Sequence, residues 1–371
     1  MEQRACGPNR NGTVVLVKMD GIGDFILFLD AARALRELYN NKKLFLCCSR
    51  GVEAVASNTG YFDRVYCFER EDFFEENIEH TFDRIQELKC ELLLHPSQPR
   101  HVFAEILCYL INADKKIASL GETGGMSEDI KAECDTIYDE MIDQGIENMA
   151  LIQSANFIRG LGFEAYRARI PKIENVKKYP IHLPEDYFII FLGGSIYHKL
   201  WYPEYFNSIA EYIHTKTGWD CVLCGDRFDE EQERVFGGGE FTNYYSYVGR
   251  TKNIDEVVYI ISKSHVVVGN DTSAIHIANA LQIPSLCIAG QFAGKKFYPY
   301  TPEIEENNGV LPIAVTHDVD CSGCIIRHRD YECIGGDYFA HKKLKCVSGV
   351  SYDNVKMNVD ALLYVADRRR K

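Results

Sequence analysis

The sequence Lys-Met-Asp-Gly-Ile-Gly-Asp at residues 18–24 lies between a short apolar run, residues 14–17, and a longer one, residues 25–38. This pattern predicts a parallel strand, a glycine-rich turn and a helix. Ligands of open α/β sheets bind beyond the carboxyl ends of such strands, and a charged group there loses solvation unless it has a partner. The turn, with Asp24 at its end, is therefore the first candidate active site.

Two simpler interpretations of this turn stay open. Gly21 and Gly23 match the first two glycines of a nicotinamide-dinucleotide fingerprint, but Ile26 occupies the position of the third. A pyrophosphate would also meet the like charge of Asp24. The other interpretation is a tight turn in which an aspartate caps the helix.

The composition is that of an ordinary globular protein. With 371 residues, 46% hydrophobic and 26% charged, the chain predicts two domains of similar size. The formal net charge of −13 argues against a broad nucleic-acid surface, which needs clustered Lys and Arg. Most of the fourteen cysteines are scattered, and the polar first twelve residues hold no signal-peptide core. We therefore expect a cytoplasmic protein, with peripheral contact at the inner membrane as a further alternative.

Short apolar runs alternate with longer amphipathic segments along most of the chain, which is typical of βαβ units and a parallel sheet. In the first half we expect strands at 13–17, 44–48, 64–68, 91–95 and 115–119, and helices at 25–39, 75–88, 101–111 and 135–161. In the second half we expect strands at 187–192, 220–223, 265–268 and 285–288, and helices at 203–215, 255–262, 273–281 and 352–369.

This alternation predicts an α/β protein with two Rossmann-like, doubly wound domains that face each other across a cleft. Residues 1–170 form the first domain, and the proline-bearing residues 171–186 form a linker. Residues 187–350 form the second domain with a cysteine-rich insertion, and residues 351–371 form a terminal helix.

A turn at residues 193–203 has the chemistry of an anion site. Gly194 and Ser195 offer close backbone approach and a hydroxyl, and Lys199 offers an ammonium group suited to a phosphate oxygen. The simpler alternative is a surface lysine beside a packed tryptophan.

A second turn, residues 268–276, also joins a strand to a helix. Asp271 or Thr272 can cap the helix and leave backbone N–H groups, such as that of Ser273, for an anion. His276 lies on the same helical face as Thr272. The simpler alternative is a helix cap beside a buried core histidine.

The three segments, in this order and spacing, resemble glycosyltransferase family 9, the ADP-heptose:lipopolysaccharide heptosyltransferases. The family has a basic residue before a Gly-Asp turn, a Lys/Arg-x-Trp-Pro stretch and a Gly-Asn-Asp-Thr-Gly-Pro-x-His signature. This chain differs by an extra Tyr202 before Pro203, by Ser273-Ala274 in place of Gly-Pro, and by Gly290-Gln291-Phe292 in place of Gly-Pro-Thr.

The resemblance implies a GT-B fold, with a glycolipid or other glycan acceptor mainly on the first domain and a nucleotide-sugar donor on the second. It also implies inverting transfer that needs no metal. It matches Asp24 to the catalytic aspartate and Lys199 to a diphosphate-binding lysine. The other predicted substrate-binding residues are Lys18, Gly23, Gly194, Ser195, Asp271, Thr272, Ser273 and His276.

Four cysteines near the end of the second domain form a separate candidate site. Cys321 and Cys324 make a C-x-x-C pair, and Cys333 and Cys346 follow. Four thiolates at such spacing are suited to a structural zinc or iron ion. The resemblance points the same way, because one branch of the family carries a four-cysteine iron site there. Reduced or incidentally paired thiols are the alternative.

The leading functional hypothesis is a glycosyltransferase that moves a heptose or related sugar from a nucleoside diphosphate to a cell-envelope acceptor such as lipopolysaccharide core. A protein acceptor is an alternative. A nucleotide-sugar epimerase would need further acidic and histidine groups that form no second constellation here. A non-catalytic nucleotide-sugar-binding or assembly protein is a further alternative that Ser273 and Ala274 favour, although the intact Asp24 and Lys199 argue against it.

Overall fold

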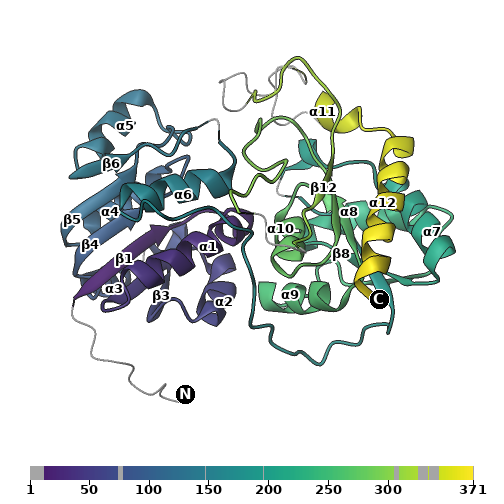
Figure 1. Ribbon diagram of the computed structural model, residues 1–371, viewed down its shortest axis with the longest axis horizontal. Coiled ribbons are helices and arrows are strands. Elements are labelled where there is room, and N and C mark those ends of the chain that lie inside the picture. Colours follow the sequence, from purple (N-terminus) through teal and green to yellow (C-terminus); the bar gives the residue numbers. More distant parts are fainter. Residues whose placement is uncertain are drawn as a thin grey trace. The chain divides into compact units, whose positions relative to one another are not determined.

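The computed structural model describes residues 12–73, 78–146, 148–194, 196–304, 309–324, 333 and 342–370. The chain divides into two compact units. Unit 1 comprises Met1–Arg169 with Pro302–Ile304, and unit 2 comprises Ile170–Thr301 with Glu305–Lys371. Each unit contains one six-stranded parallel sheet with helices packed on it (Figure 1).

The sheet of unit 1 has the strand order β3-β2-β1-β4-β5-β6. Its strands are β1 (Thr13–Lys18), β2 (Lys43–Cys48), β3 (Arg64–Cys67), β4 (Cys90–His95), β5 (Ala113–Ser119) and β6 (Glu140–Ile142). The helices between them are α1 (Ile22–Leu38), α2 (Arg50–Thr59), η1 (Arg70–Phe73), α3 (Ile78–Gln86), α4 (Val102–Leu110), α5 (Glu128–Asp135) and α6 (Ala150–Gly160). The strand order reverses between β1 and β4, where an α/β sheet binds its ligands.

The sheet of unit 2 repeats this topology with the order β12-β11-β10-β7-β8-β9. Its strands are β7 (Tyr187–Phe191), β8 (Asp220–Cys224), β9 (Tyr244–Ser246), β10 (Val267–Asn270), β11 (Ser285–Ile288) and β12 (Ile313–Val315). Its helices are η3 (Tyr197–Lys199), α7 (Pro203–Thr217), η4 (Arg227–Asp229), α8 (Glu230–Gly237), α9 (Ile254–Lys263), α10 (Ser273–Ala280), α11 (Lys345–Ser348) and α12 (Tyr352–Arg370). Here the order reverses between β7 and β10.

The central strands are apolar on both faces, as expected for a sheet covered on both sides. The side chains of β1 from Val14 to Val17 have no exposed surface, and neither do those of β7 from Phe188 to Ile190. Residues 170–186 contain neither helix nor strand in the structure. All nine strands expected from the sequence are present, with β10 beginning two residues later than expected.

The expected helix at 135–161 is wrong. α5 ends at Asp135, β6 pairs parallel with β5, and only α6 of the remaining stretch is helical. The chain turns between β6 and α6, where Asp143 accepts a hydrogen bond from the N–H of Gly145 at 2.8 Å and Gly145 has a φ of +70°. Because side chains disfavour such a φ, a glycine with this geometry interrupts a helix. Residues 75–77 of the helix expected at 75–88 lie outside the described residues.

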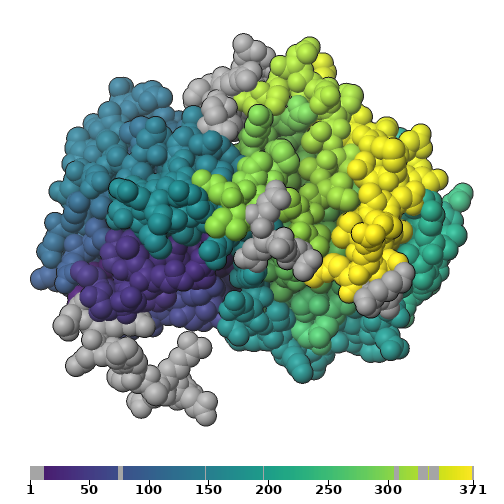
Figure 2. Space-filling model, in the orientation of Figure 1, coloured from purple at the N-terminus to yellow at the C-terminus, as the bar shows by residue number. Residues whose placement is uncertain are grey.

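α12 lies on the surface of unit 2, as the yellow atoms of Figure 2 show. One side of the helix is buried through Val355, Val359 and Leu362, while Met357 and Tyr364 are exposed. This is the pattern of an amphipathic helix that covers a sheet. Within the described parts of the chain, no helix is both long and apolar enough to cross a membrane.

Candidate functional site

The turn after β1 places Asp24 in the first turn of α1, half-buried. Gly21 is the N-cap residue and its carbonyl oxygen accepts from the N–H of Phe25 at 3.1 Å. Gly21 has no side chain that could cap the helix, and Asp24 lies three residues after it, a position from which an acidic side chain can also cap a helix start. A carboxylate in the first turn of a helix is also stabilised by the helix dipole.

A buried ion pair lies beneath this turn. The ammonium of Lys18 contacts the carboxylate of Asp20 and lies 5.2 Å from the centroid of the Phe28 ring. The hydroxyl of Ser97, in the loop after β4, donates to Asp20 Oδ2 at 2.7 Å. Asp20 therefore joins the two loops that follow the neighbouring strands β1 and β4. Lys18, predicted to bind substrate, lies in this network with only 6% of its surface exposed.

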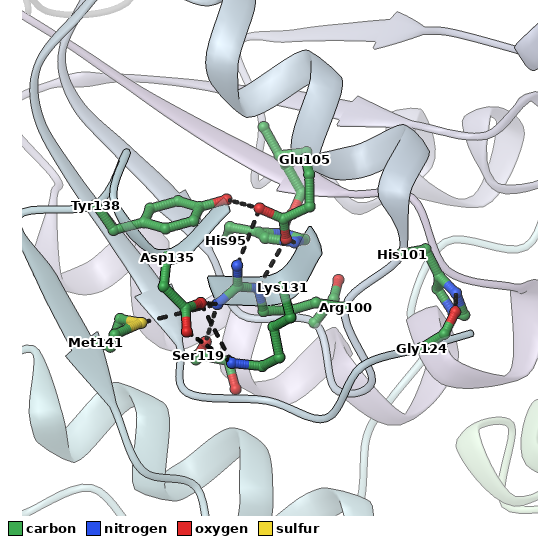
Figure 3. A network of polar contacts seen from close by, with 12 residues as sticks. His95, Arg100, His101, Glu105, Ser119, Gly124, Lys131, Asp135, Tyr138 and Met141 are labelled. Atoms are coloured by element: carbon green, nitrogen blue, oxygen red, sulfur yellow. Dashed lines mark hydrogen bonds and ion pairs between the residues drawn. The ribbon is translucent and has the colours of Figure 1, made fainter. Parts of the chain in front are cut away.

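The same β4 loop is fixed by a larger charged network, drawn in Figure 3. Arg100 is fully buried and donates to both carboxylate oxygens of Glu105, at 2.7 and 3.0 Å. A further guanidinium N–H donates to Asp135 at 2.6 Å, and the hydroxyl of Tyr138 donates to Glu105 at 2.8 Å. His95 Nε2 lies 3.3 Å from Glu105. A bidentate Arg–carboxylate pair of this kind has one preferred geometry.

Arg100 also joins this loop to the loop after β5. Its backbone N–H donates to the carbonyl of Glu122 at 3.1 Å. At Gly124, which has a φ of +54°, an added Cβ would lie 1.8 Å from the carbonyl oxygen of Arg100. The loops at residues 96–101 and 119–125 therefore pack as one rigid body beside the Asp20 turn.

In unit 2, Lys199 ends the short helix η3 after β7. Its Nζ lies 3.9 Å from the centroid of the Phe292 ring, a cation–π contact. Phe292 is 2% exposed, whereas Lys199 is half-buried. An added Cβ at Gly194 would lie 3.7 Å from the methyl group of Thr272, so the turns after β7 and β10 are in contact. Ser195, also predicted to bind substrate, lies outside the described residues.

The helix α10 starts as the sequence predicts. Thr272 is its N-cap, and its hydroxyl accepts from the N–H of Ala274 at 3.3 Å. Asp271, Thr272 and Ser273 are half-buried. This helix start, beside Gly194, is a suitable place for an anion.

His276 points into the protein rather than toward solvent. It is 3% exposed, and its Nδ1 lies 2.5 Å from the hydroxyl oxygen of Tyr300. Its ring stacks on Tyr298 at 5.5 Å and on Tyr300 at 5.9 Å. This environment favours the interpretation of a core histidine that supports α10.

Sequence reasoning missed Asp229, which lies under the first glycine turn of unit 2. An added Cβ at Gly193 would lie 2.2 Å from its Oδ2. Burial raises the pKa of Asp229 to about 6, although hydrogen bonds from the backbone of Asp226 and Gly194 oppose the shift. Nothing in the local sequence distinguishes this aspartate from the acidic residues that follow it, because its partners lie elsewhere in the fold.

The four cysteines are neighbours but do not form a ready ligand set. Burial raises the pKa of Cys346 to about 11, the N–H of Gln291 opposes this, and the thiols of Cys333, Cys324 and Cys321 add to it. Among the residues that the structure describes, no group of three or more His, Cys, Asp or Glu side chains is arranged to hold a metal. A raised pKa also disfavours the thiolate that a metal requires.

Among the solved structures with a similar fold are three glycosyltransferases. A glycosyltransferase family 9 protein from Veillonella parvula superposes with a TM-score of 0.70 over 96% of this chain and 98% of its own, at 15% identity. The ADP-heptose lipopolysaccharide heptosyltransferase II of E. coli gives 0.66 over 95% and 98%, at 13% identity. The iron-containing dodecameric glycosyltransferase TibC of enterotoxigenic E. coli gives 0.52 over 98% and 78%, at 13% identity. The two doubly wound units thus have the GT-B fold.

A family model matches part of the chain. Residues 165–318 match the model described as glycosyltransferase family 9 (heptosyltransferase). The matched segment contains the turns that carry Lys199 and Thr272. No curated protein matches the chain.

Glu105 should make the stability of unit 1 depend on acid pH. Burial would raise its pKa, but the hydrogen bonds from His95 and Arg100 outweigh burial and hold the pKa at about 2 rather than 4.5. The unfolded chain therefore takes up this proton first, and stability falls as the pH drops from about 4.5 to 2. Glu105→Gln should lower the free energy of unfolding at pH 7 by on the order of 3 kcal/mol. On acidification, the free energy of unfolding of this variant should fall less than that of wild type, because the titrating carboxylate is gone.

Urea unfolding at pH 7 and at several pH values between about 4.5 and 2 measures both effects. Glu140→Gln is the matched control, because Glu140 forms an exposed pair with Lys115. An equal acid-induced loss in wild type and Glu105→Gln would contradict the assignment.

Proposed function

We propose that the protein is an inverting, metal-independent glycosyltransferase that transfers a heptose or related sugar from a nucleoside diphosphate, ADP-heptose in the first instance. The proposal rests on one observation above all. In unit 2, the glycine turn with Lys199 and the Thr272-capped start of α10 follow the adjacent strands β7 and β10, where the sheet order reverses. The family 9 match and the fold of E. coli heptosyltransferase II agree with it.

Unit 2 would bind the donor through its diphosphate. The ammonium of Lys199 and the N–H groups at the start of α10 are suited to phosphate oxygens, and Gly194 lets the backbone approach them. Negative charge grows on the diphosphate as the glycosidic bond breaks. Donors fixed in advance around that charge stabilise the transition state without reorganisation.

Asp24 of unit 1 would act as the general base. Its carboxylate would take the proton of an acceptor hydroxyl while that oxygen attacks the anomeric carbon, which inverts the configuration. Such assistance is typically worth about 10²- to 10⁴-fold in rate. The ion pair of Lys18 and Asp20 and the Ser97 contact would hold the turn that carries Asp24.

The acceptor would be a cell-envelope glycan such as lipopolysaccharide core, with a protein side chain as the alternative acceptor. The described cysteines are all free thiols, which is compatible with the proposal that the protein acts in the reducing cytoplasm. The proposed reaction uses no step through a zinc or iron ion at the cysteine cluster, where such an ion would have a structural role only.

A panel of ADP, GDP, UDP and CDP sugars in a thermal-shift assay tests the donor. A ligand that binds only the native state raises its melting temperature, so ADP-heptose should give the largest shift. Lys199→Ala should lose most of this shift, because its ammonium no longer meets the diphosphate. Lys263→Ala, an exposed lysine at the end of α9, is the control. An unchanged shift in Lys199→Ala would remove the phosphate assignment, and no shift with any sugar nucleotide would contradict the function.

Asp24→Asn should bind the donor nearly as wild type does, while transfer falls by about 10²-fold or more, since the amide cannot accept the proton. Donor consumption in the presence of an acceptor extract measures transfer, and the thermal shift measures binding. Asp63→Asn, a partly exposed aspartate of the same unit, is the control. Turnover within a few-fold of wild type would exclude Asp24 as the base.

Metal analysis of protein purified without chelators tests the cysteine cluster. Because no group of side chains among the described residues is arranged to hold a metal, zinc and iron at background level are expected, and Cys321→Ser with Cys324→Ser should change little. About one equivalent in wild type that this double substitution removes would instead show a structural ion. Buried Cys287, which lies in β11, supplies the control substitution Cys287→Ala. Metal at background level in wild type would exclude the structural ion that the cysteine spacing suggested.

A further inference from the structure

The segment at residues 342–348, at the end of the cysteine-rich insertion, is bonded to the turn that carries Lys199. The ammonium of Lys343 donates to the carbonyl of Leu200 at 2.7 Å and lies 3.3 Å from that of Trp201. The N–H of Leu344 donates to the carbonyl of His198 at 3.0 Å, and His198 Nδ1 donates to the carbonyl of Lys342. These contacts reach the residues on both sides of Lys199.

Two tyrosine rings hold the ammonium of Lys343 in place. It lies 4.9 Å from the centroid of Tyr197 and 5.3 Å from that of Tyr202. Tyr202 is the residue by which this chain exceeds the Lys/Arg-x-Trp-Pro stretch of the family. Burial lowers the pKa of Lys343 to about 8, and Glu204 opposes the shift. Contacts with two carbonyl oxygens and two aromatic rings thus replace part of the hydration of the ammonium group.

The same segment also supports the ring beneath Lys199. α11 begins two residues after Lys343, and its Val347 lies 3.0 Å from where a Cβ at Gly290 would be. That position is also 2.8 Å from the Phe292 ring, so Phe292 and α11 close tightly around Gly290. Phe292 in turn carries the ammonium of Lys199 at 3.9 Å.

We infer that Lys343 is a positioning residue for the donor diphosphate: it ties the segment 342–348 to the turn at 197–202 and so fixes where Lys199 presents its charge. The inference rests on the proposed function of Lys199. Lys343 itself holds backbone carbonyls and aromatic faces. Its effect on the donor passes through Lys199, because a binding group fixed in advance loses less entropy when the ligand arrives.

The test compares Lys343→Met, Lys343→Arg and the control Lys345→Met, an exposed lysine two residues away. Calorimetry with ADP gives the affinity, thermal melting gives the global stability, and amide hydrogen exchange reports on residues 196–202. Lys343→Met should bind ADP about tenfold more weakly, exchange faster in 196–202 alone, and melt within a few degrees of wild type. Lys343→Arg should regain most of the affinity, and Lys345→Met should behave as wild type.

Each other outcome is decisive. Wild-type affinity and wild-type exchange in Lys343→Met would overturn the inference, and so would a loss of affinity that accompanies faster exchange throughout unit 2, which indicates a purely structural lysine. If wild type does not bind ADP while Lys199→Ala also changes nothing, the proposed function fails. The local exchange of residues 196–202 then still decides whether Lys343 holds the turn.

Discussion

The side-chain amide of Asn270 is the constraint on which the geometry of unit 2 depends. This side chain is 1% exposed, donates to the carbonyl of Leu192 at 2.6 Å and accepts from the N–H of Trp201 at 2.8 Å. One residue at the end of β10 therefore fixes the end of β7 and the chain just after Lys199. The amide offers a donor to one of these backbone groups and an acceptor to the other, whereas an aspartate would set a carboxylate against the Leu192 carbonyl.

In unit 1, a charged side chain joins the two neighbouring loops instead of an amide. The first and fourth strands of this unit are also neighbours, and Asp20 joins the loops after them by accepting from Ser97. A buried carboxylate is costly unless it is paired, and Lys18 supplies the pair. In both units the polar turns lie where the strand order reverses. Beyond the ends of the two strands, no backbone hydrogen bonds among the described residues join the neighbouring chain segments. A side chain from one segment therefore bonds to the other and holds the two together.

The sequence was sufficient for features that depend on local pattern. The apolar strands, the glycine turns and the Thr272 cap are read from residues a few positions apart. It failed where the partner lies far along the chain. The stretch 135–161 has helical composition, but β5 pairs with part of it as β6. Lys343 is one lysine among several in its segment, and only the carbonyls of Leu200 and Trp201, more than a hundred residues earlier, distinguish it. The roles of Asp229 and Asn270 likewise become visible only in the structure, because their partners lie far away in the sequence.

Lys18 and Lys199 were both predicted to bind substrate, and their surroundings now separate them. Lys18 is buried against a carboxylate that neutralises it, so little of its charge remains for a ligand. Lys199 is half-buried and rests on the Phe292 ring. An aromatic face attracts an ammonium and holds it in place. The presence of Phe292 where the family has a small residue is therefore compatible with donor binding, because the ring fixes the position of the ammonium.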